Sequence, residues 1–133
     1  MADSPQRIDR PLSPHLQIYR PLFTMMMSIV HRITGVGLYF GTAILVWWLL
    51  ATATSPSAFE TFSAVAGSPL GMLVLFGFTW ALLHHAFGGV RHFIWDFIHG
   101  FGAKERELLA KASLAGSVAC TVILWIIGLA LKG

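Results

Sequence analysis

Three long stretches of this chain contain no Asp, Glu, Lys or Arg, and they restrict its fold more than any other feature. They cover residues 33–59, 61–90 and 112–131 of the 133 residues. About twenty consecutive apolar residues in a helix cross a hydrocarbon core of roughly 30 Å. We therefore expect an all-α membrane protein with three transmembrane helices, at about residues 25–51, 70–95 and 110–131. Residues 25–131 would form the membrane domain, and residues 1–24 an N-terminal arm.

The composition excludes several classes of function. Apolar residues make up 56% of the chain and charged residues only 11%, whereas soluble domains are about a quarter charged. A soluble enzyme is thus excluded, and any chemistry must lie within the bilayer or on partner chains. The nine basic residues are scattered, which argues against nucleic-acid binding. The single cysteine, Cys120, excludes thiolate metal sites and covalent C-x-x-C-H haem attachment.

The distribution of Lys and Arg predicts the orientation of the chain. Four basic residues precede or enter the first span, none lies in the first loop, four lie around the second loop, and one follows the third span. Short basic segments stay in the cytoplasm, so the N-terminus is expected to be cytoplasmic. The first twenty residues match neither a secretory signal nor a transit peptide. This favours the bacterial inner membrane over a processed mitochondrial form. Prolines prevent the arm from forming one helix, and both a partner-bound strap and a disordered tail fit it.

Ionisable residues at the end of the second span form one group of candidate functional residues. At 100° per residue, His85, Gly89, His92 and Asp96 share one helical face. A buried imidazole is a good haem-iron ligand, and a glycine one turn away lets a flat macrocycle approach. The alternative is that His85 hydrogen-bonds a neighbouring helix while the other polar residues cap the helix and extend to the interface.

A haem b iron takes two axial ligands, and this face supplies one suitable histidine. His84 is adjacent but points about 100° away, so His84 and His85 cannot both bind one iron. The second ligand would come from another chain or from His84.

A second group of polar residues lies where the chain enters the first span. Ser28 and Arg32 are four residues apart and share a helical face. A hydroxyl and a guanidinium can donate to quinone carbonyls, and the cation can stabilise the negative charge of a reduced quinone. The alternative is a helix cap and a positively charged anchor. Gly37 and Gly41 form a small-residue pair that would permit close helix packing.

Two ordered motifs resemble the signatures of the succinate dehydrogenase cytochrome b family. The first comprises Arg10-Pro11-Leu12-Ser13-Pro14-His15-Leu16 followed by Ser28-Ile29-Val30-His31-Arg32-Ile33-Thr34-Gly35. The second, from His85 to Asp96, fits the pattern H-x-x-x-G-x-R-H-x-x-x-D. The resemblance covers the chain from about Arg10 onward.

The resemblance implies a non-catalytic subunit, the larger membrane anchor of respiratory complex II. Its partners would be a flavoprotein that oxidises succinate, an iron-sulfur protein and a second small anchor, which together form a heteromeric helix bundle in the membrane. His85 would be the axial ligand of haem b, paired with a histidine of the second anchor. Ser28 and Arg32 would contact ubiquinone, while His31, Arg32 and His92 would lie near the haem propionates. A fumarate reductase anchor and a haem-free three-span packing or transport subunit are the alternative functions.

Overall fold

Helices account for nearly all of the chain that the computed structural model describes, which is residues 18–132. There are four of them, α1 (Phe23–Thr54), α2 (Pro56–Ala66), α3 (Pro69–Asp96) and α4 (Ala103–Lys132). Three, namely α1, α3 and α4, are long and apolar enough to span a membrane. The expected all-α membrane fold with three spans is therefore confirmed. Most of the predicted arm lies outside the described residues.

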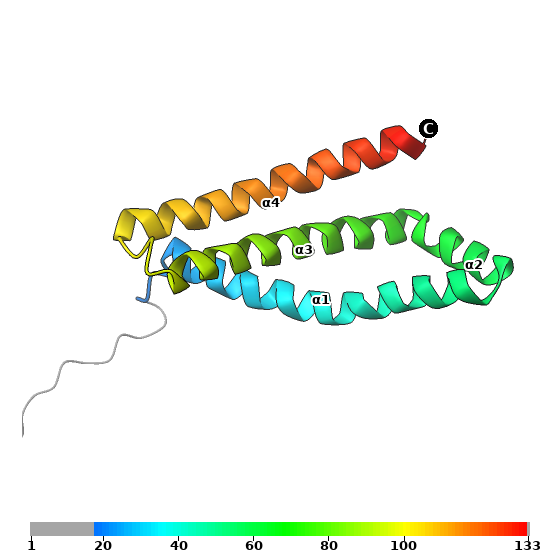
Figure 1. Ribbon diagram of the computed structural model, residues 1–133, viewed down its shortest axis with the longest axis horizontal. Coiled ribbons are helices and arrows are strands. Elements are labelled where there is room, and N and C mark those ends of the chain that lie inside the picture. Colours follow the sequence, from blue (N-terminus) through cyan, green and yellow to red (C-terminus); the bar gives the residue numbers. More distant parts are fainter. Residues whose placement is uncertain (1–17, 133) are drawn as a thin grey trace, which may run out of the picture.

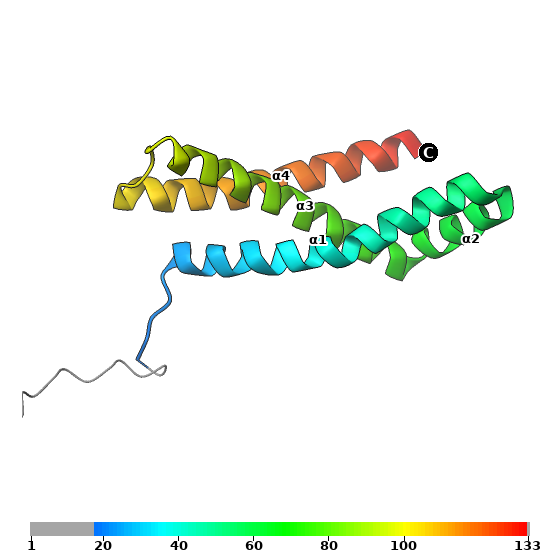
Figure 2. The same cartoon turned by 60° about the horizontal axis from the view of Figure 1, so that its bottom comes forward.

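The three long helices form an elongated bundle in which α3 packs against both α1 and α4 (Figures 1 and 2). The start of α1, the end of α3 and the start of α4 lie at one end of the bundle, and we call this the histidine end. The end of α1, helix α2 and the end of α4 lie toward the other end. The start of α1 and the end of α4 are thus at opposite ends, as three crossings require.

Helix α2 lies in the segment that we expected to be the first loop. Two Ser-Pro pairs mark its bounds. Ser55 caps α2 by accepting a hydrogen bond from the Ala58 amide at 3.2 Å, and Ser68 caps α3 in the same way. A serine N-cap followed by proline is a strong start signal for a helix. These pairs were the available sequence signal for α2.

Helix α4 begins at Ala103, seven residues before the expected start near residue 110. Its first turns are charged, so they contribute little to a hydropathy signal. They are nevertheless rich in good helix formers. Glu105 accepts a hydrogen bond from the Gly102 amide at 3.0 Å, and Lys111 forms an ion pair with Glu107 at 2.7 Å. The helix thus extends beyond the apolar segment expected to cross the bilayer.

Burial in the bundle is the reverse of that in a soluble protein. Among the described residues, three hydrophobic side chains are buried, whereas six polar or charged side chains are buried. The buried polar residues are Thr34, His84, Arg91, Ser113, Ser117 and Thr121. Most Leu, Ile, Val and Phe side chains of the spans face outward. Such a surface requires lipid or partner helices around it.

Only one glycine of the expected small-residue pair makes a close contact. Gly41 packs against the ring of Phe78 on α3, where a Cβ would overlap the ring, whereas Gly37 has open space around it. The Gly41 contact is within this chain, and it fixes how closely α1 approaches α3.

Candidate functional site

Three histidines from two helices meet at the histidine end. The rings of His31 on α1 and His85 on α3 stack with centroids 4.0 Å apart and planes 6° apart. The ring of His92, two turns further along α3, lies 5.5 Å from that of His31. The structure therefore brings His31, from the start of the first span, against two histidines of the group at the end of the second span.

The ring of His85 forms a hydrogen bond through one of its two nitrogens. Its Nδ1 lies 3.1 Å from the backbone oxygen of His31. A carbonyl oxygen only accepts hydrogen bonds, so Nδ1 carries the proton and donates. In a neutral imidazole, Nε2 then carries a lone pair. No hydrogen bond to Nε2 is found within residues 18–132. Metal-binding histidines characteristically donate their other ring N–H to such an acceptor, so His85 fits the role of a haem ligand.

The hydrogen bond to His85 is supported by residues of α1. The hydroxyl of Thr34 donates to the same His31 oxygen at 2.9 Å. Gly35 leaves room for the imidazole, since a Cβ there would lie 3.0 Å from the His85 Cε1. The ring orientation of His85 is therefore set by the backbone of α1.

His84 faces a different helix and is enclosed by this chain. It is 2% exposed, and its Nδ1 lies 3.2 Å from the Ser117 hydroxyl of α4. That hydroxyl donates its proton to the Leu114 oxygen at 2.8 Å, so it accepts from His84. The ring also stacks near Trp80 with a centroid distance of 5.2 Å. The alternative expected for His85, a hydrogen bond to a neighbouring helix, is thus met by both histidines: His84 bonds α4 and His85 bonds α1.

Two adjacent glycines have opposite surroundings. Gly88 lies directly against the imidazole of His31, and a Cβ there would overlap the ring. Gly89, on the predicted face with His85, has nothing within 4 Å. Sequence reasoning selected Gly89 and did not single out Gly88, which sets the approach of α1 to α3. The open face at Gly89 leaves room for a flat group beside His85.

Ser28 and Arg32 lie on α1 one turn apart. Arg32 is exposed and Ser28 is half-buried. Neither side chain makes a hydrogen bond or ion pair to another residue in the described part of the chain. Their donors are thus available to a bound molecule. Arg32 also follows His31 directly, so the expected quinone contacts adjoin the histidine cluster.

Arg91 is the one buried cation of the site within residues 18–132. It is 5% exposed, and its guanidinium carbon lies 5.2 Å from the centre of the Trp95 ring. Its Nε is buried without a hydrogen-bond partner among residues 18–132. His92 packs edge-on against the same tryptophan at 5.1 Å, whereas Asp96 is exposed and forms no ion pair within residues 18–132. Arg91 is the arginine of the second motif, but spacing along one helix could not show that its side chain is buried.

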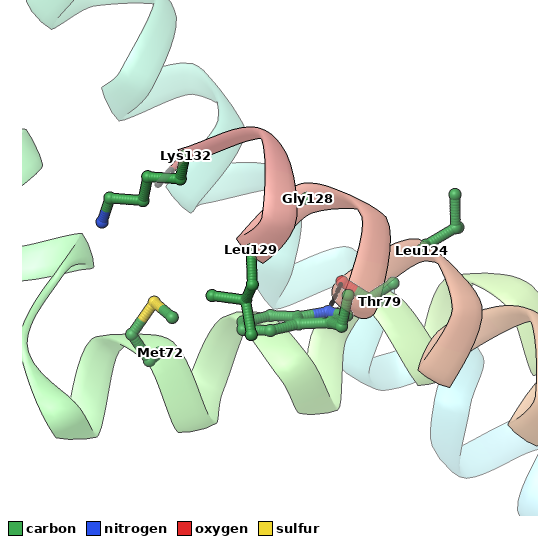
Figure 3. Close-up of a pocket in the computed structure, with 7 residues that line it drawn as sticks. Met72, Thr79, Leu124, Gly128, Leu129 and Lys132 are labelled. Carbon is green, nitrogen blue, oxygen red and sulfur yellow. Dashed lines mark hydrogen bonds between the residues drawn. The ribbon is translucent and has the colours of Figure 1, made fainter.

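The other end of the bundle has an apolar groove between α3 and α4 (Figure 3). Its volume is about 340 Å³, and it is lined by Met72, Thr79, Leu124, Trp125, Gly128, Leu129 and Lys132. The Trp125 indole donates to the Thr79 hydroxyl at 3.2 Å. Lys132 is the one ionisable residue in this lining. The groove thus offers little for redox or acid–base chemistry, in contrast to the histidine end.

Comparisons of this chain with a family model and with known proteins all indicate the same family. The family model described as succinate dehydrogenase/fumarate reductase transmembrane subunit matches residues 6–126. The succinate dehydrogenase cytochrome b556 subunit of Paracoccus denitrificans is 42% identical over 96% of this chain and 97% of its own length. That of Rickettsia conorii is 36% identical over 88% and 91%.

A mitochondrial relative gives the same result over a shorter region. The succinate dehydrogenase cytochrome b560 subunit of Sus scrofa is 38% identical over 69% of this chain and 56% of its own length. Because the family model spans most of the chain and two bacterial relatives align almost end to end, this chain belongs to the family of succinate dehydrogenase/fumarate reductase transmembrane subunits.

Proposed function

We propose that this chain is the larger membrane anchor of a succinate dehydrogenase, and that it binds haem b and forms part of a ubiquinone reduction site. The chain itself catalyses no reaction. A flavoprotein and an iron-sulfur protein would bind at the histidine end, and a second anchor would complete the helix bundle. The names of the relatives, which are succinate dehydrogenase cytochrome b subunits, support this choice over a haem-free packing subunit.

The observation that carries the haem proposal is the hydrogen bond from His85 Nδ1 to the His31 oxygen. It leaves Nε2 as the lone-pair donor and fixes the plane of the ring. His84 is a poorer candidate ligand, because its ring is enclosed by this chain and held against Ser117. The second axial ligand would therefore come from another chain, and the family resemblance implies a histidine of the second anchor. When bound, the haem supplies a one-electron carrier beside the quinone site.

Charged and polar groups around the stacked histidines suit the haem carboxylates. His31, Arg32 and His92 would hold the propionates at the edge of the membrane. Arg32 is exposed at this end, and the His31 ring presents a buried Nδ1 without a partner in the described residues. Because this nitrogen packs directly against Gly88, a propionate would have to reach the other ring nitrogen, Nε2.

Ser28 and Arg32 would form one wall of the ubiquinone site. Reduction of ubiquinone takes two electrons and two protons, and negative charge develops on the quinone oxygens as electrons arrive. The Ser28 hydroxyl would hold one carbonyl oxygen by donating a hydrogen bond. The Arg32 guanidinium would stabilise the developing charge. The rest of the site, including the proton donors, would come from the iron-sulfur protein and the second anchor.

The chain would lie in the bacterial inner membrane with the histidine end toward the cytoplasm. Four basic residues before or at the start of the first span and four around the second loop support this orientation. The open space around Gly37 on α1 and Gly77 on α3 would allow the second anchor to pack closely against these two helices.

The experiment that tests the proposal is a difference spectrum of the intact complex purified through this chain. We expect flavin to co-purify, and a b-type band to appear with dithionite and at least partly with succinate. Absence of both the haem band and flavin would contradict the proposal and favour a haem-free packing subunit.

A further inference from the structure

Arg91 presents a positive charge in the interior of the bundle that no residue between 18 and 132 pairs. The residue is 5% exposed, its Nε is buried without a partner, and its guanidinium lies over the Trp95 ring at 5.2 Å. The ring face attracts the cation but does not neutralise its charge. A buried charge without a counterion is costly and is seldom retained without a role.

No carboxylate of the described helices neutralises this arginine. Three acidic residues lie at the histidine end, and all are exposed: Asp96, Glu105 and Glu107. Glu105 accepts from the Gly102 amide and Glu107 pairs with Lys111. Asp96 forms no ion pair with Arg91 or with any other residue between 18 and 132. The positive field of Arg91 is therefore uncompensated within this part of the chain.

The charge of Arg91 lies close enough to His85 to act on a group bound there. The two residues lie six positions apart on α3, which is about 9 Å along the helix axis and about 120° around it. Buried charges are screened much less than exposed ones. The other Arg and Lys residues described at this end are exposed: Arg20, Arg32, Lys104, Arg106 and Lys111. Arg91 is thus the one buried cation within residues 18–132, and its charge is the least screened by water.

We propose that Arg91 is a positioning residue for the redox chemistry, whose fixed charge raises the reduction potential of the haem bound at His85. This inference rests on the proposed haem function. Reduction adds one electron from the donor to the haem and lowers the charge of the site by one. A fixed cation nearby therefore stabilises the reduced form relative to the oxidised form. The cation contacts neither iron nor quinone, and it acts through space.

The magnitude follows from Coulomb's law. At a separation of about 12 Å and an effective dielectric constant of about 20, loss of one unit charge changes the ratio of reduced to oxidised haem roughly tenfold. An exposed cation at a similar distance has a much smaller effect because water and salt screen it. Arg106, exposed in the first turn of α4, is the matched control.

The test is an optical redox titration of the intact complex, with dithionite as reductant and redox mediators, for the wild type and for Arg91→Met, Arg91→Gln, Arg91→Lys and Arg106→Met. At the wild-type midpoint potential, we expect the reduced-to-oxidised ratio to fall about tenfold in the two neutral Arg91 variants. We expect it to stay within about twofold in Arg91→Lys and Arg106→Met.

Each alternative outcome has a distinct meaning. An unchanged ratio in a haem-containing Arg91→Met or Arg91→Gln complex would overturn the inference. So would a shift in Arg91→Lys as large as in Arg91→Met, because charge would then not be the cause. Loss of haem from both neutral variants with retention in Arg91→Lys would assign Arg91 to assembly and likewise overturn it. A wild-type complex without haem would instead contradict the proposed function itself.

Discussion

Replacing Gly88 by Ala should separate α1 from α3 at the histidine cluster. A Cβ at this position would overlap the imidazole of His31. That ring is itself stacked on His85 with centroids 4.0 Å apart, so it cannot move away from Gly88 without changing this stacking. The new methyl group must therefore push the two helices apart or displace the ring.

The net cost can be estimated from two opposing effects. Overpacking of a tight contact costs about 1–3 kcal/mol, and a rigid ring on the other side places this contact near the upper limit. Replacing a helical Gly by Ala gains about 1 kcal/mol of helix propensity. We therefore expect a net loss of about 2 kcal/mol, which changes the unfolding equilibrium roughly thirtyfold.

The assay is a titration of the purified complex with sodium dodecyl sulfate, followed by tryptophan fluorescence. Gly77→Ala is the control, because Gly77 lies in the same helix with nothing within 4 Å. The double variant Gly88→Ala with His31→Ala should recover most of the loss, since the ring is then absent. If Gly88→Ala proves as stable as Gly77→Ala, or if removing the ring gives no recovery, the described contact between the helices is refuted.

Other predictions concern the quinone contacts and the helix packing. Arg32→Leu should lower quinone reductase activity about tenfold or more, through loss of a charge-assisted hydrogen bond, while succinate oxidation with an artificial acceptor is kept; an equal loss of both activities would instead indicate failed assembly. Ser28→Ala should lower the same activity by a smaller factor, and an unchanged rate would remove Ser28 from the site. Ser117→Ala should destabilise the bundle by about 1–3 kcal/mol, because His84 Nδ1 loses its acceptor, yet leave the haem spectrum unchanged; a spectral shift would count against the separation of the two histidines. Ser68→Ala should cost about 1 kcal/mol through loss of the α3 cap, measured by the same detergent titration, and no loss would show that the cap is dispensable.

The fold was largely predictable because the membrane imposes it. Uncharged stretches of about twenty residues leave a helix as the only element that satisfies its own backbone in lipid. The starts of the helices were harder to predict. Charged residues at the start of α4 resemble a loop on a hydropathy scale although they favour a helix. Helix α2 is short and only partly apolar, so its signal was the serine cap rather than hydrophobicity.

The composition of the site was predictable, but its contacts were not. Helical spacing placed His85 and His92 on one face and separated His84 from them, and the contacts of His84 and His85 with different helices agree with that separation. Spacing along one helix cannot show which residues of another helix it meets. The stacking of His31 on His85, the contact at Gly88 and the inward position of Arg91 all depend on the packing of α1 and α4 against α3.

The central claim, that His85 and not His84 binds the haem iron, is tested most directly by spectra of two neighbouring variants. His85→Leu and His84→Leu are made separately in the intact complex, and each is reduced with dithionite. The account predicts that His85→Leu loses or weakens the b-type band, whereas His84→Leu largely preserves it. A preserved band in His85→Leu together with a lost band in His84→Leu would contradict the account and move the ligand by one residue.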